Sequence, residues 1–408
     1  MDIIITPTHL SGSVTAPPSK SAAHRLLLCA ALSKGESVVK NIYPSKDILA
    51  TIGCLEALGA RIELKGDTAY VRGIEDTPDE CVLDCNESGS TLRFMIPVAC
   101  ALGCKATFIG RGRLPERPIT PYLDELPKHG AVIEYNGTMP FTVGGKLTSG
   151  RYEIRGDISS QFITGLLYGL IFTEGDSELV MTTPLQSRPY VDMTCDALSR
   201  FGADIRKNGD IYYIKGGCRL TPQNFTVEGD YSQAAFFEVA DALGCDIDIK
   251  GLNVNSYQGD KKIVEIISEI VYNNKKGLKP FDVDVSDIPD LVPILAVLGS
   301  FCEGTSYIRN AARLRIKECD RLHAMAVSLN ACGGKVTEKE DELVIEGVKA
   351  LTGGEVPDFN DHRIPMAMSI AAVRSEKPVI IRGAQSVSKS YPDFWEVYKD
   401  IGGIIETV

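Results

Sequence analysis

The sequence predicts an α/β protein built from six copies of one βαβαββ-like unit. Three observations support this fold class. Glycines recur at a regular interval after helix-like segments. Apolar helix-like segments with polar first residues recur at nearly the same interval, and a β-rich segment follows each of them. Self-similarity at a fixed period is the sequence signature of a repeated architecture.

The glycine series marks where a predicted helix reverses into a predicted strand. Gly59, Gly130 and Gly202 lie 71 and 72 residues apart, and Gly333 and Gly402 lie 69 residues apart. Glycine at the end of a helix adopts the left-handed conformation that turns the chain back. A sixth copy is expected near residue 273, where Asn273 and Asn274 replace glycine; asparagine tolerates this conformation next best.

The helix series runs in step with the glycines. Its first residues are Lys20, Gly89, Ser160, Tyr231, Asp290 and His362, with spacings of 69, 71, 71, 59 and 72 residues. The strand-like segments that follow are 36–42, 105–111, 177–183, 246–252, 305–311 and 378–384. Because these helices lack a wide polar face, we expect them to lie buried beneath sheets.

Six such units allow a solenoid, a ring or two groups of three. A unit of about 70 residues is longer than the 20–50 typical of solenoids and propellers, which disfavours an open stack. Two groups of three suit the usual size of a domain better. The candidate crossing points between the two groups are 16–18 and 228–230.

Composition excludes several classes of protein. The 408 residues carry a formal net charge of −11, which disfavours a nucleic-acid binder, since phosphate backbones are held mainly by excess Lys and Arg. The longest apolar stretches, such as 162–172, are too short to cross a bilayer. The first residues lack the pattern of a signal peptide, so we expect a cytoplasmic enzyme or scaffold.

Metal and cofactor motifs are weak or missing. Cys81, Cys85, Cys100 and Cys104 have the spacing of a four-thiolate zinc site, but their helix-like and strand-like context favours buried, reduced thiols. The five histidines show no metal-ligand spacing, and neither a P-loop nor a dinucleotide fingerprint is present. We therefore expect no metal and no cofactor.

Several predicted helix starts carry cations. Lys20 with Arg25, Arg93 beside Gly89, and Arg363 after His362 oppose the positive end of a helix dipole and cost stability unless an anion binds. Free N–H groups with Lys or Arg form phosphate or carboxylate sites. Simple capping by the polar residues is the alternative for any single start. Together they favour a small polyanionic ligand.

Three further segments fit this interpretation. Segment 111–118 is rich in arginine and follows a predicted strand, and segment 313–321 mixes cations with Glu318 and Asp320. For 313–321, the alternative is an exposed helix start with weak surface ion pairs. Asp290 is the one carboxylate among the helix-start positions, and capping is an equally good interpretation of it.

The ordered motifs resemble the enolpyruvyl transferase family. They are PSKSAAHR at 18–25, SGSTLR at 88–93, LPERPI at 114–119, SSQFITGLL at 159–167, SRPY at 187–190, RIKECDRL at 315–322, NDHRIPMAM at 360–368 and SKSYPDFW at 388–395. The resemblance implies a two-domain inside-out α/β barrel with three units per domain. One domain would comprise 1–16 plus 229–408 and the other 17–228, with the active site in the cleft between them.

The resemblance also implies the reaction and its residues. The enolpyruvyl group of phosphoenolpyruvate would pass to the 5-hydroxyl of shikimate 3-phosphate, in the shikimate pathway to chorismate and aromatic amino acids, and glyphosate would target the site. The implied catalytic residues are Asp290, Glu318 and Lys20. Those for shikimate 3-phosphate are Lys20, Ser21, Arg25, Ser159, Ser160, Gln161, Ser187, Asp290 and Lys317. Those for phosphoenolpyruvate are Lys20, Gly89, Arg117, Gln161, Arg321, Arg363 and Lys389.

We expect the chain to act as a monomer on these two substrates, without nucleic acid or membrane. Two alternatives exist. One is the branch of the same family that uses UDP-N-acetylglucosamine, but that branch carries a reactive cysteine in the loop equivalent to 111–118, where this chain has none. The other is a non-catalytic anion-binding repeat scaffold, which would need the cations but neither Asp290 nor Glu318.

Overall fold

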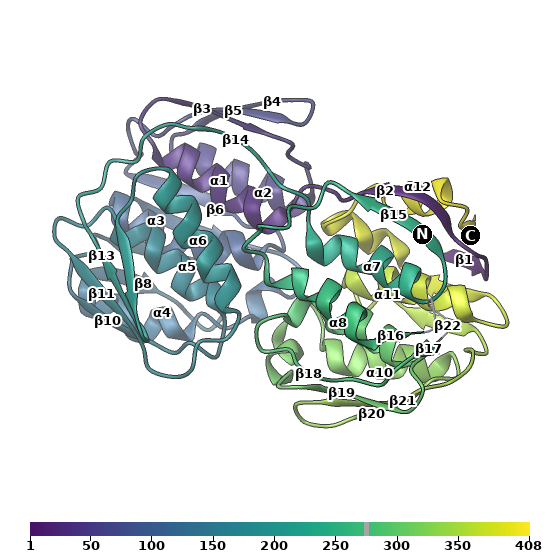
Figure 1. Ribbon diagram of the computed structural model, residues 1–408. Helices are drawn as coiled ribbons and strands as arrows, with labels where there is room; N and C mark the ends of the chain where they lie inside the picture. Colours follow the sequence, from purple (N-terminus) through teal and green to yellow (C-terminus); the bar gives the residue numbers. More distant parts are fainter. Residues whose placement is uncertain (273–276) are drawn as a thin grey trace. The chain divides into compact units, whose positions relative to one another are not determined.

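The computed structural model describes residues 1–272 and 277–408 and divides the chain into two compact units (Figure 1). Unit 1 comprises Met1–Pro17 and Gly229–Val408, and unit 2 comprises Pro18–Glu228. Each unit has a hydrophobic core of its own. Asn273 and Asn274, where a turn was predicted, lie outside the described residues.

Unit 2 contains three four-stranded sheets of one topology. In each, the first two strands pair in parallel and the remaining neighbours pair antiparallel. The orders are β14 (Asn224–Thr226), β3 (Glu36–Lys40), β5 (Thr68–Arg72), β4 (Arg61–Lys65); β6 (Glu80–Asp84), β7 (Lys105–Ile109), β9 (Phe141–Gly145), β8 (Ala131–Glu134); and β10 (Arg151–Ile154), β11 (Ser177–Met181), β13 (Ile211–Ile214), β12 (Ile205–Asn208).

The described part of unit 1 repeats this topology in two sheets. They are β18 (Asp282–Asp284), β19 (Thr305–Arg309), β21 (Leu343–Glu346), β20 (Lys335–Glu338); and β22 (Gly354–Pro357), β23 (Val379–Arg382), β1 (Ile3–Thr6), β24 (Ile404–Thr407). Two strand pairs complete it, β15 (Asp246–Lys250) with β2 (Ser11–Thr15) and β16 (Val271–Tyr272) with β17 (Gly277–Leu278). The pairing of β1 with β24 places the two ends of the chain side by side (Figure 1).

The helices alternate with the strands along the chain. Those of unit 2 are α1 (Lys20–Leu32), α2 (Lys46–Ala57), α3 (Gly89–Leu102), α4 (Thr120–Glu125), α5 (Ser160–Leu170) and α6 (Arg188–Arg200), with the 3₁₀ turns η1 (Leu114–Glu116) and η2 (Leu126–His129). Those of unit 1 are α7 (Tyr231–Ala242), α8 (Lys262–Ile270), α9 (Val292–Gly299), α10 (Arg321–Ala331), α11 (Arg363–Ala371) and α12 (Phe394–Asp400), with η3 (Gly259–Lys261), η4 (Pro289–Leu291), η5 (Ala312–Ile316), η6 (Ala372–Arg374) and η7 (Ala384–Lys389).

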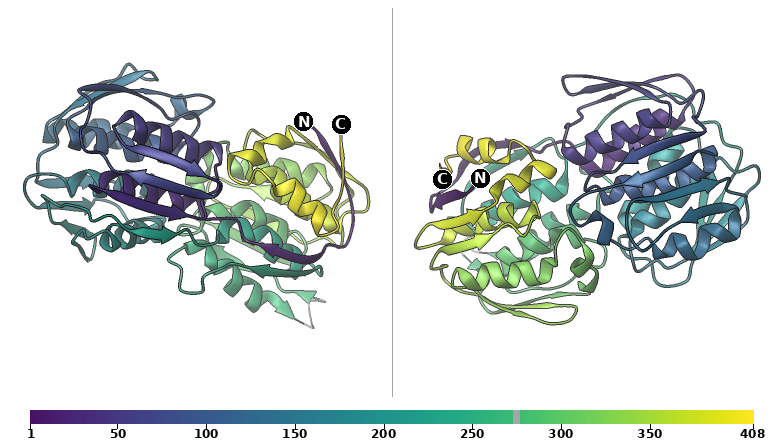
Figure 2. Two further views of the ribbon diagram at one scale, coloured as in Figure 1. Left: turned by 90° about the horizontal axis from the view of Figure 1, so that it is seen from above. Right: turned by 180° about the vertical axis from the view of Figure 1, so that it is seen from behind.

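The predicted burial of the repeated helices is confirmed. All residues of α9 and α11 are buried, and α3 is buried from Thr91 to Cys100. Within each unit these helices lie inside while the sheets lie around them, as the views of Figure 2 show. A helix that is apolar all round gains stability only when every face is covered, so this arrangement satisfies the sequence.

The predicted turns are also confirmed. Gly59, Gly130 and Gly202 have φ of 109°, 88° and 98°, and Gly333 and Gly402 have 87° and 94°. A side chain at these angles is strained, because its Cβ crowds the backbone. At these five positions glycine therefore lets the preceding helix or 3₁₀ turn reverse toward the next strand.

The predicted helix starts are largely confirmed, and the caps come from the preceding residue. Helices α1, α3 and α5 begin at the expected positions, and Ser19, Ser88 and Ser159 accept backbone N–H bonds as their N-caps. His362 directly precedes α11 but makes no cap hydrogen bond through its side chain, and Asp290 lies in η4 just before α9. Because serine supplies the cap, Lys20 and Gly89 are not needed for capping.

Candidate active site

The predicted site residues, together with Arg93 and Asp361, form two groups, one in each unit. The first group, called the unit 2 cluster, comprises Lys20, Ser21, Arg25, Gly89, Arg93, Arg117, Ser159, Ser160, Gln161 and Ser187. The second, called the Asp290 cluster, comprises Asp290, Lys317, Glu318, Arg321, Asp361, Arg363 and Lys389. Each is described within its own unit.

Gly89 lies beside three polar side chains of the unit 2 cluster. A Cβ placed on it would be 2.5 Å from Nη1 of Arg117, 3.1 Å from Nη1 of Arg93 and 3.5 Å from Oε1 of Gln161. Arg93 donates to Gln161 Oε1 over 2.6 Å, and Gln161 Nε2 donates to Ser90 Oγ over 2.8 Å. Only glycine leaves room for two guanidinium groups at the start of a buried helix, where free N–H groups also favour an anion.

Lys20, the first residue of α1, pairs with Asp47 in the first turn of α2. The Lys20 Nζ to Asp47 Oδ2 distance is 2.7 Å, and both side chains are mostly buried. This carboxylate offsets the unfavourable position of a lysine at the positive end of a helix dipole. The ion pair also holds the ammonium group in one place.

Arg25 is held by neutral oxygens. It is 4% exposed, and its guanidinium donates to the carbonyl oxygens of Ser21 and Tyr190, each over 2.7 Å, and to Thr194 Oγ1 over 2.9 Å. Burial lowers the pKa of Arg25. Ser187, which begins α6 with a φ of 54°, joins this region because its carbonyl accepts the N–H of Tyr190. The bonds rigidly orient a cation in an apolar surrounding.

The Asp290 cluster is a network of charges around one carboxylate. Arg321 Nη1 donates to Asp290 Oδ1 over 2.8 Å, and Arg363 Nη2 donates to Oδ2 over 3.2 Å. Lys317 Nζ lies 3.8 Å from Oδ1. These contacts show that Asp290 is bound to cations, so the interpretation of Asp290 as a helix cap is wrong.

Arg321 connects the other acids of this cluster. The side chain is 2% exposed and donates to Asp361 Oδ2 over 2.7 Å and to Glu318 Oε2 over 2.9 Å. Asp361, 0% exposed, also accepts the backbone N–H of Arg363 over 2.9 Å. Lys389 Nζ donates to the carbonyl of Asn360, the residue before Asp361, over 2.8 Å.

The pKa values follow from this crowding. Burial alone would raise the pKa of Asp290, but Arg363, Lys317 and Arg321 hold it well below its usual range. Burial lowers the pKa of Lys317 to about 8, although Asp290 opposes the shift. Perturbed values of this kind are typical of functional sites. At neutral pH the cluster therefore holds an ionised carboxylate beside a lysine whose proton is easily lost.

Three residues were missing from the predicted set. The sequence singled out Arg93 as a cation of the helix start that contains Gly89 but placed it in neither substrate set, and Asp361 lies in the helix start that contains Arg363. Asp47 precedes a helix and resembles an ordinary first-turn carboxylate. Nothing in its spacing predicts the pair with Lys20.

Other cations of the predicted segments are structural. Arg315 pairs with Asp320 over 2.8 Å and with Glu338 over 2.6 Å, and Arg111 pairs with Asp84 over 2.9 Å. In segment 313–321, helix α10 begins only at Arg321. The surface-pair interpretation therefore applies to Arg315 but not to Arg321, which is itself buried and pairs with the buried Asp361.

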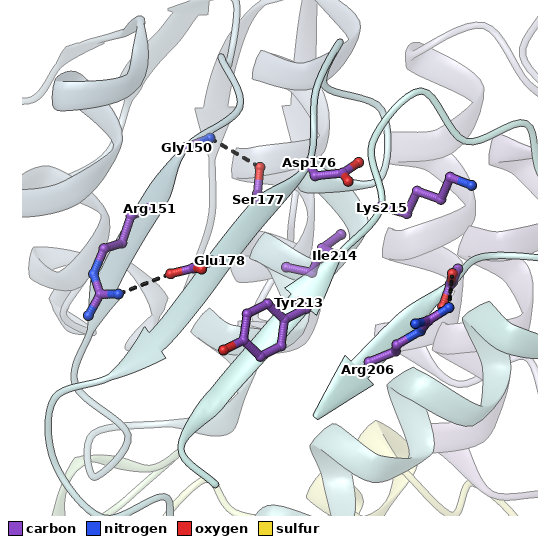
Figure 3. Close-up of a pocket in the computed structure, with 10 residues that line it drawn as sticks. Gly150, Arg151, Asp176, Ser177, Glu178, Arg206, Tyr213, Ile214 and Lys215 are labelled. Atoms are coloured by element: carbon purple, nitrogen blue, oxygen red, sulfur yellow. Dashed lines mark hydrogen bonds and ion pairs between the residues drawn. The ribbon is translucent and has the colours of Figure 1, made fainter. Parts of the chain in front are cut away.

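A hollow of about 540 Å³ in unit 2 lies outside both clusters (Figure 3). Residues of β10, β11 and β13 line it, together with Asp204, Arg206 and Lys215. Its arginines are satisfied locally, since Arg151 pairs with Glu178 over 3.0 Å and Arg206 with Asp204 over 3.2 Å. No predicted site residue lines this hollow.

Metal and membrane features are missing from residues 1–272 and 277–408. No three His, Cys, Asp or Glu side chains there are grouped to hold a metal ion, and none of the helices there has the length and apolarity of a membrane span. All twelve cysteines are free. Cys104 Sγ donates to Cys81 Sγ over 3.4 Å, whereas Cys100 Sγ donates to the Gly144 carbonyl.

The α/β fold carries two clusters rich in arginine and lysine, an arrangement suited to small polyanions. Comparisons with known proteins identify the chain further. The sequence model described as EPSP synthase (3-phosphoshikimate 1-carboxyvinyltransferase) matches residues 4–398. The chain is 45% identical to the 3-phosphoshikimate 1-carboxyvinyltransferase of Clostridium novyi (strain NT), covering 99% of this chain and 98% of that one. It is 43% identical to that of Clostridioides difficile (strain 630), covering 98% of each.

A solved structure supports the same family. EPSP synthase from Acinetobacter baumannii superposes with a TM-score of 0.84 at 26% identity, covering 100% of both chains. The chain belongs to the EPSP synthase family. It is therefore a transferase of the shikimate pathway, which leads to aromatic amino acids, and its chemistry is enolpyruvyl transfer. The predicted family and α/β fold class are confirmed, and the non-catalytic scaffold is excluded.

Proposed function

We propose that the unit 2 cluster and the Asp290 cluster together transfer the enolpyruvyl group of phosphoenolpyruvate to the 5-hydroxyl of shikimate 3-phosphate. The observation that carries the proposal is Asp290, an ionised carboxylate held by Arg321 and Arg363 beside Lys317. A hydroxyl nucleophile needs a base, and two anionic substrates need converging cations. The proposal requires residues 1–16 plus 229–408 and 17–228 to act as two domains on the same substrates.

Shikimate 3-phosphate would bind through its phosphate and its ring. Ser159, Ser160 and Gln161 would offer hydroxyl, amide and backbone N–H donors at the start of α5, an arrangement that favours phosphate. Lys20, Ser21 and Arg25 would add donors from α1, and Ser187 from the start of α6. Lys317 and Asp290 would hold the ring hydroxyls.

Phosphoenolpyruvate would bind to cations from both clusters. Arg117 and the backbone at Gly89 would meet one end of the molecule, with Lys20 and Gln161 beside them. Arg321, Arg363 and Lys389 would meet the other charged group. Guanidinium groups grip carboxylate and phosphate with two parallel hydrogen bonds, which fixes the angle of the substrate as well as its position.

The chemistry would proceed by addition and elimination. The 5-hydroxyl oxygen attacks C2 of phosphoenolpyruvate while Asp290 takes the hydroxyl proton, and Glu318 delivers a proton to C3. The tetrahedral adduct then loses phosphate from C2 and returns a proton from C3 to Glu318, so the double bond re-forms as an enol ether. Asp290 passes the hydroxyl proton on to the departing phosphate, which leaves both carboxyl groups as they began. Lys20 neutralises the departing phosphate, and Asp47 keeps the ammonium in place.

We also propose that one chain suffices and that it works in the cytoplasm. The proposed roles call on residues of a single chain and require no second copy. Light scattering at the concentration used for assays tests this. A dimer whose activity vanishes on dilution would contradict it.

The experiment for the reaction is a phosphate-release assay. We expect release when shikimate 3-phosphate and phosphoenolpyruvate are both present, and none when either is omitted. Replacing shikimate 3-phosphate with UDP-N-acetylglucosamine should give no release. Release with the nucleotide sugar, but not with shikimate 3-phosphate, would contradict the proposed acceptor.

A further inference from the structure

A chain of buried polar side chains connects α1, α2 and α3 within unit 2. His24 Nδ1 lies 2.7 Å from Thr51 Oγ1, and Thr51 Oγ1 lies 2.7 Å from Thr91 Oγ1. Thr91 Oγ1 in turn donates to Ser88 Oγ over 2.7 Å. All four side chains are buried. Such short contacts away from water make every partner matter, because a lost bond leaves a buried polar group unsatisfied.

The direction of every hydrogen bond in this chain follows from its last member. Ser88 Oγ is the N-cap of α3 and accepts both the N–H and the hydroxyl proton of Thr91. A hydroxyl has one proton to donate. Because Thr91 gives its proton to Ser88, it must accept from Thr51. Thr51 then donates its only hydroxyl proton to Thr91, so it must accept a hydrogen bond from His24.

His24 must therefore carry its proton on Nδ1. The other ring nitrogen, Nε2, is buried and has no partner within residues 1–272 and 277–408. This fits the derived tautomer, because an unpaired acceptor is tolerated better than an unpaired N–H. The opposite tautomer would bury an N–H with nothing to accept it.

The surroundings of the ring keep it neutral. Burial is the main cause that lowers the pKa of His24 to about 3; Asp47 of α2 opposes it, while Lys20 and Arg25 of α1 add to it. From α3, the ring of Phe94 lies perpendicular to the His24 ring at a centroid distance of 6.4 Å. A neutral ring donates from one nitrogen only, so the chain has one direction throughout the physiological pH range.

The chain joins the helices that carry the proposed anion-binding groups. Helix α1 begins at Lys20 and α3 begins at Gly89, directly after Ser88. Helix α2 supplies both Thr51 and Asp47, the partner of Lys20 over 2.7 Å. The hydrogen-bond chain thus joins all three helices, and the ion pair is a second connection between α1 and α2. Moving the His24 ring would shift α1 against α2 and disturb the cap of α3.

We propose that His24 is a positioning residue that acts through Thr51 and Thr91 to hold the starts of α1 and α3 at the spacing an anionic ligand requires. This inference rests on the proposed function for its ligand, phosphoenolpyruvate. His24 need not touch the ligand. Its role is to fix where Lys20 and the backbone at Gly89 stand before the ligand arrives, which lowers the cost of binding.

Two isosteric changes break the chain at different points. His24→Leu removes the donor and keeps similar bulk, whereas Thr51→Val removes the middle hydroxyl and leaves the histidine in place. His24→Asn keeps an N–H at the position of Nδ1 and should restore the function. His9→Leu, at an exposed histidine of unit 1, is the matched control.

The experiment measures binding of inorganic phosphate and of phosphoenolpyruvate by calorimetry, together with steady-state kinetics. We expect His24→Leu and Thr51→Val to bind both probes roughly tenfold more weakly, as expected for one buried hydrogen bond. KM for phosphoenolpyruvate should rise by a similar factor while kcat stays within about twofold. Unchanged probe binding in Thr51→Val would overturn the proposal, even if His24→Leu fails to fold.

Nitrogen-15 NMR of the histidine rings provides a readout that does not depend on turnover. We expect His24 to be neutral and protonated on Nδ1 from pH 8 to pH 5, and Thr51→Val to disturb that signal. A proton on Nε2 would reverse the chain and overturn the proposal. Because the tautomer and phosphate binding need no reaction, an inactive enzyme with the expected tautomer would refute the proposed function alone.

Discussion

Replacing Asp290 with asparagine tests the proposed base most sharply. The amide keeps the size of the side chain but can neither take a proton nor carry the charge that binds Arg321 and Arg363 at 2.8 and 3.2 Å. We expect kcat to fall by roughly 10²–10⁴, the usual loss for a general base. Shikimate 3-phosphate should still bind, because its proposed phosphate donors lie in unit 2.

The structure also gives the expected cost in stability. Two charges about 4 Å apart attract by about 4 kcal/mol at the effective dielectric constant of a protein surface, and the desolvation of Asp290 offsets part of this. Arg321 keeps Glu318 and Asp361, so we expect a net loss of about 1–3 kcal/mol. Thermal unfolding of the variant measures it.

The assay compares Asp290→Asn with Asp282→Asn. Asp282 binds Arg309 over 2.7 and 3.0 Å on an exposed strand, so the control removes the same charge from an arginine pair outside both clusters. We expect the control to keep its rate of phosphate release. If Asp290→Asn turns over at the wild-type rate and is merely less stable, Asp290 is a structural partner of the arginines and the assignment fails.

Three other predictions follow from the same clusters. Gly89→Ala places a methyl group 2.5 Å from Nη1 of Arg117, so glyphosate, longer than phosphoenolpyruvate, should be weakened more; an unchanged ratio of inhibition constant to KM would contradict this. Asp361→Asn removes the charge buried against Arg321, so it should lower Tm by roughly 6–12 °C and raise KM for phosphoenolpyruvate. A fall in Tm of less than about 2 °C would show that Glu318 alone is enough to balance the charge of Arg321. Because Lys317 loses its proton as the pH rises through about 8, kcat/KM for shikimate 3-phosphate should fall above that pH, and Lys317→Met should lack this decline.

Much of the fold could be predicted from local chemistry. The turns at Gly59 and Gly130 need a conformation that few residues adopt, so the glycines themselves mark the repeats. Pairings between strands that lie far apart in the sequence could not be predicted in this way. Strand β14, at 224–226, pairs with β3, and β2, at 11–15, pairs with β15. Such pairings depend on contacts between distant segments, which local patterns do not contain.

The contacts within the candidate site were also only partly predictable from the sequence. Motifs indicated Arg321 and Arg363, but their common partner Asp290 could equally have been a cap until its contacts were known. The Lys20–Asp47 pair joins two helices across 27 residues, and the His24 chain joins three. Nothing in the sequence around Thr51 indicates which residues its hydroxyl group contacts. The role of Thr51 depends on the packing that brings α1, α2 and α3 together.

The most direct test of the addition–elimination account is to run the reaction in deuterium oxide and to locate the label in the product. Protonation of C3 followed by loss of a proton from the same carbon predicts deuterium in the vinyl group of the enol ether. Asp290→Asn and Glu318→Gln should slow this incorporation together with phosphate release. A product formed at the normal rate with no deuterium on the vinyl carbon would contradict the proton transfer to C3 that is proposed for Glu318 of the Asp290 cluster.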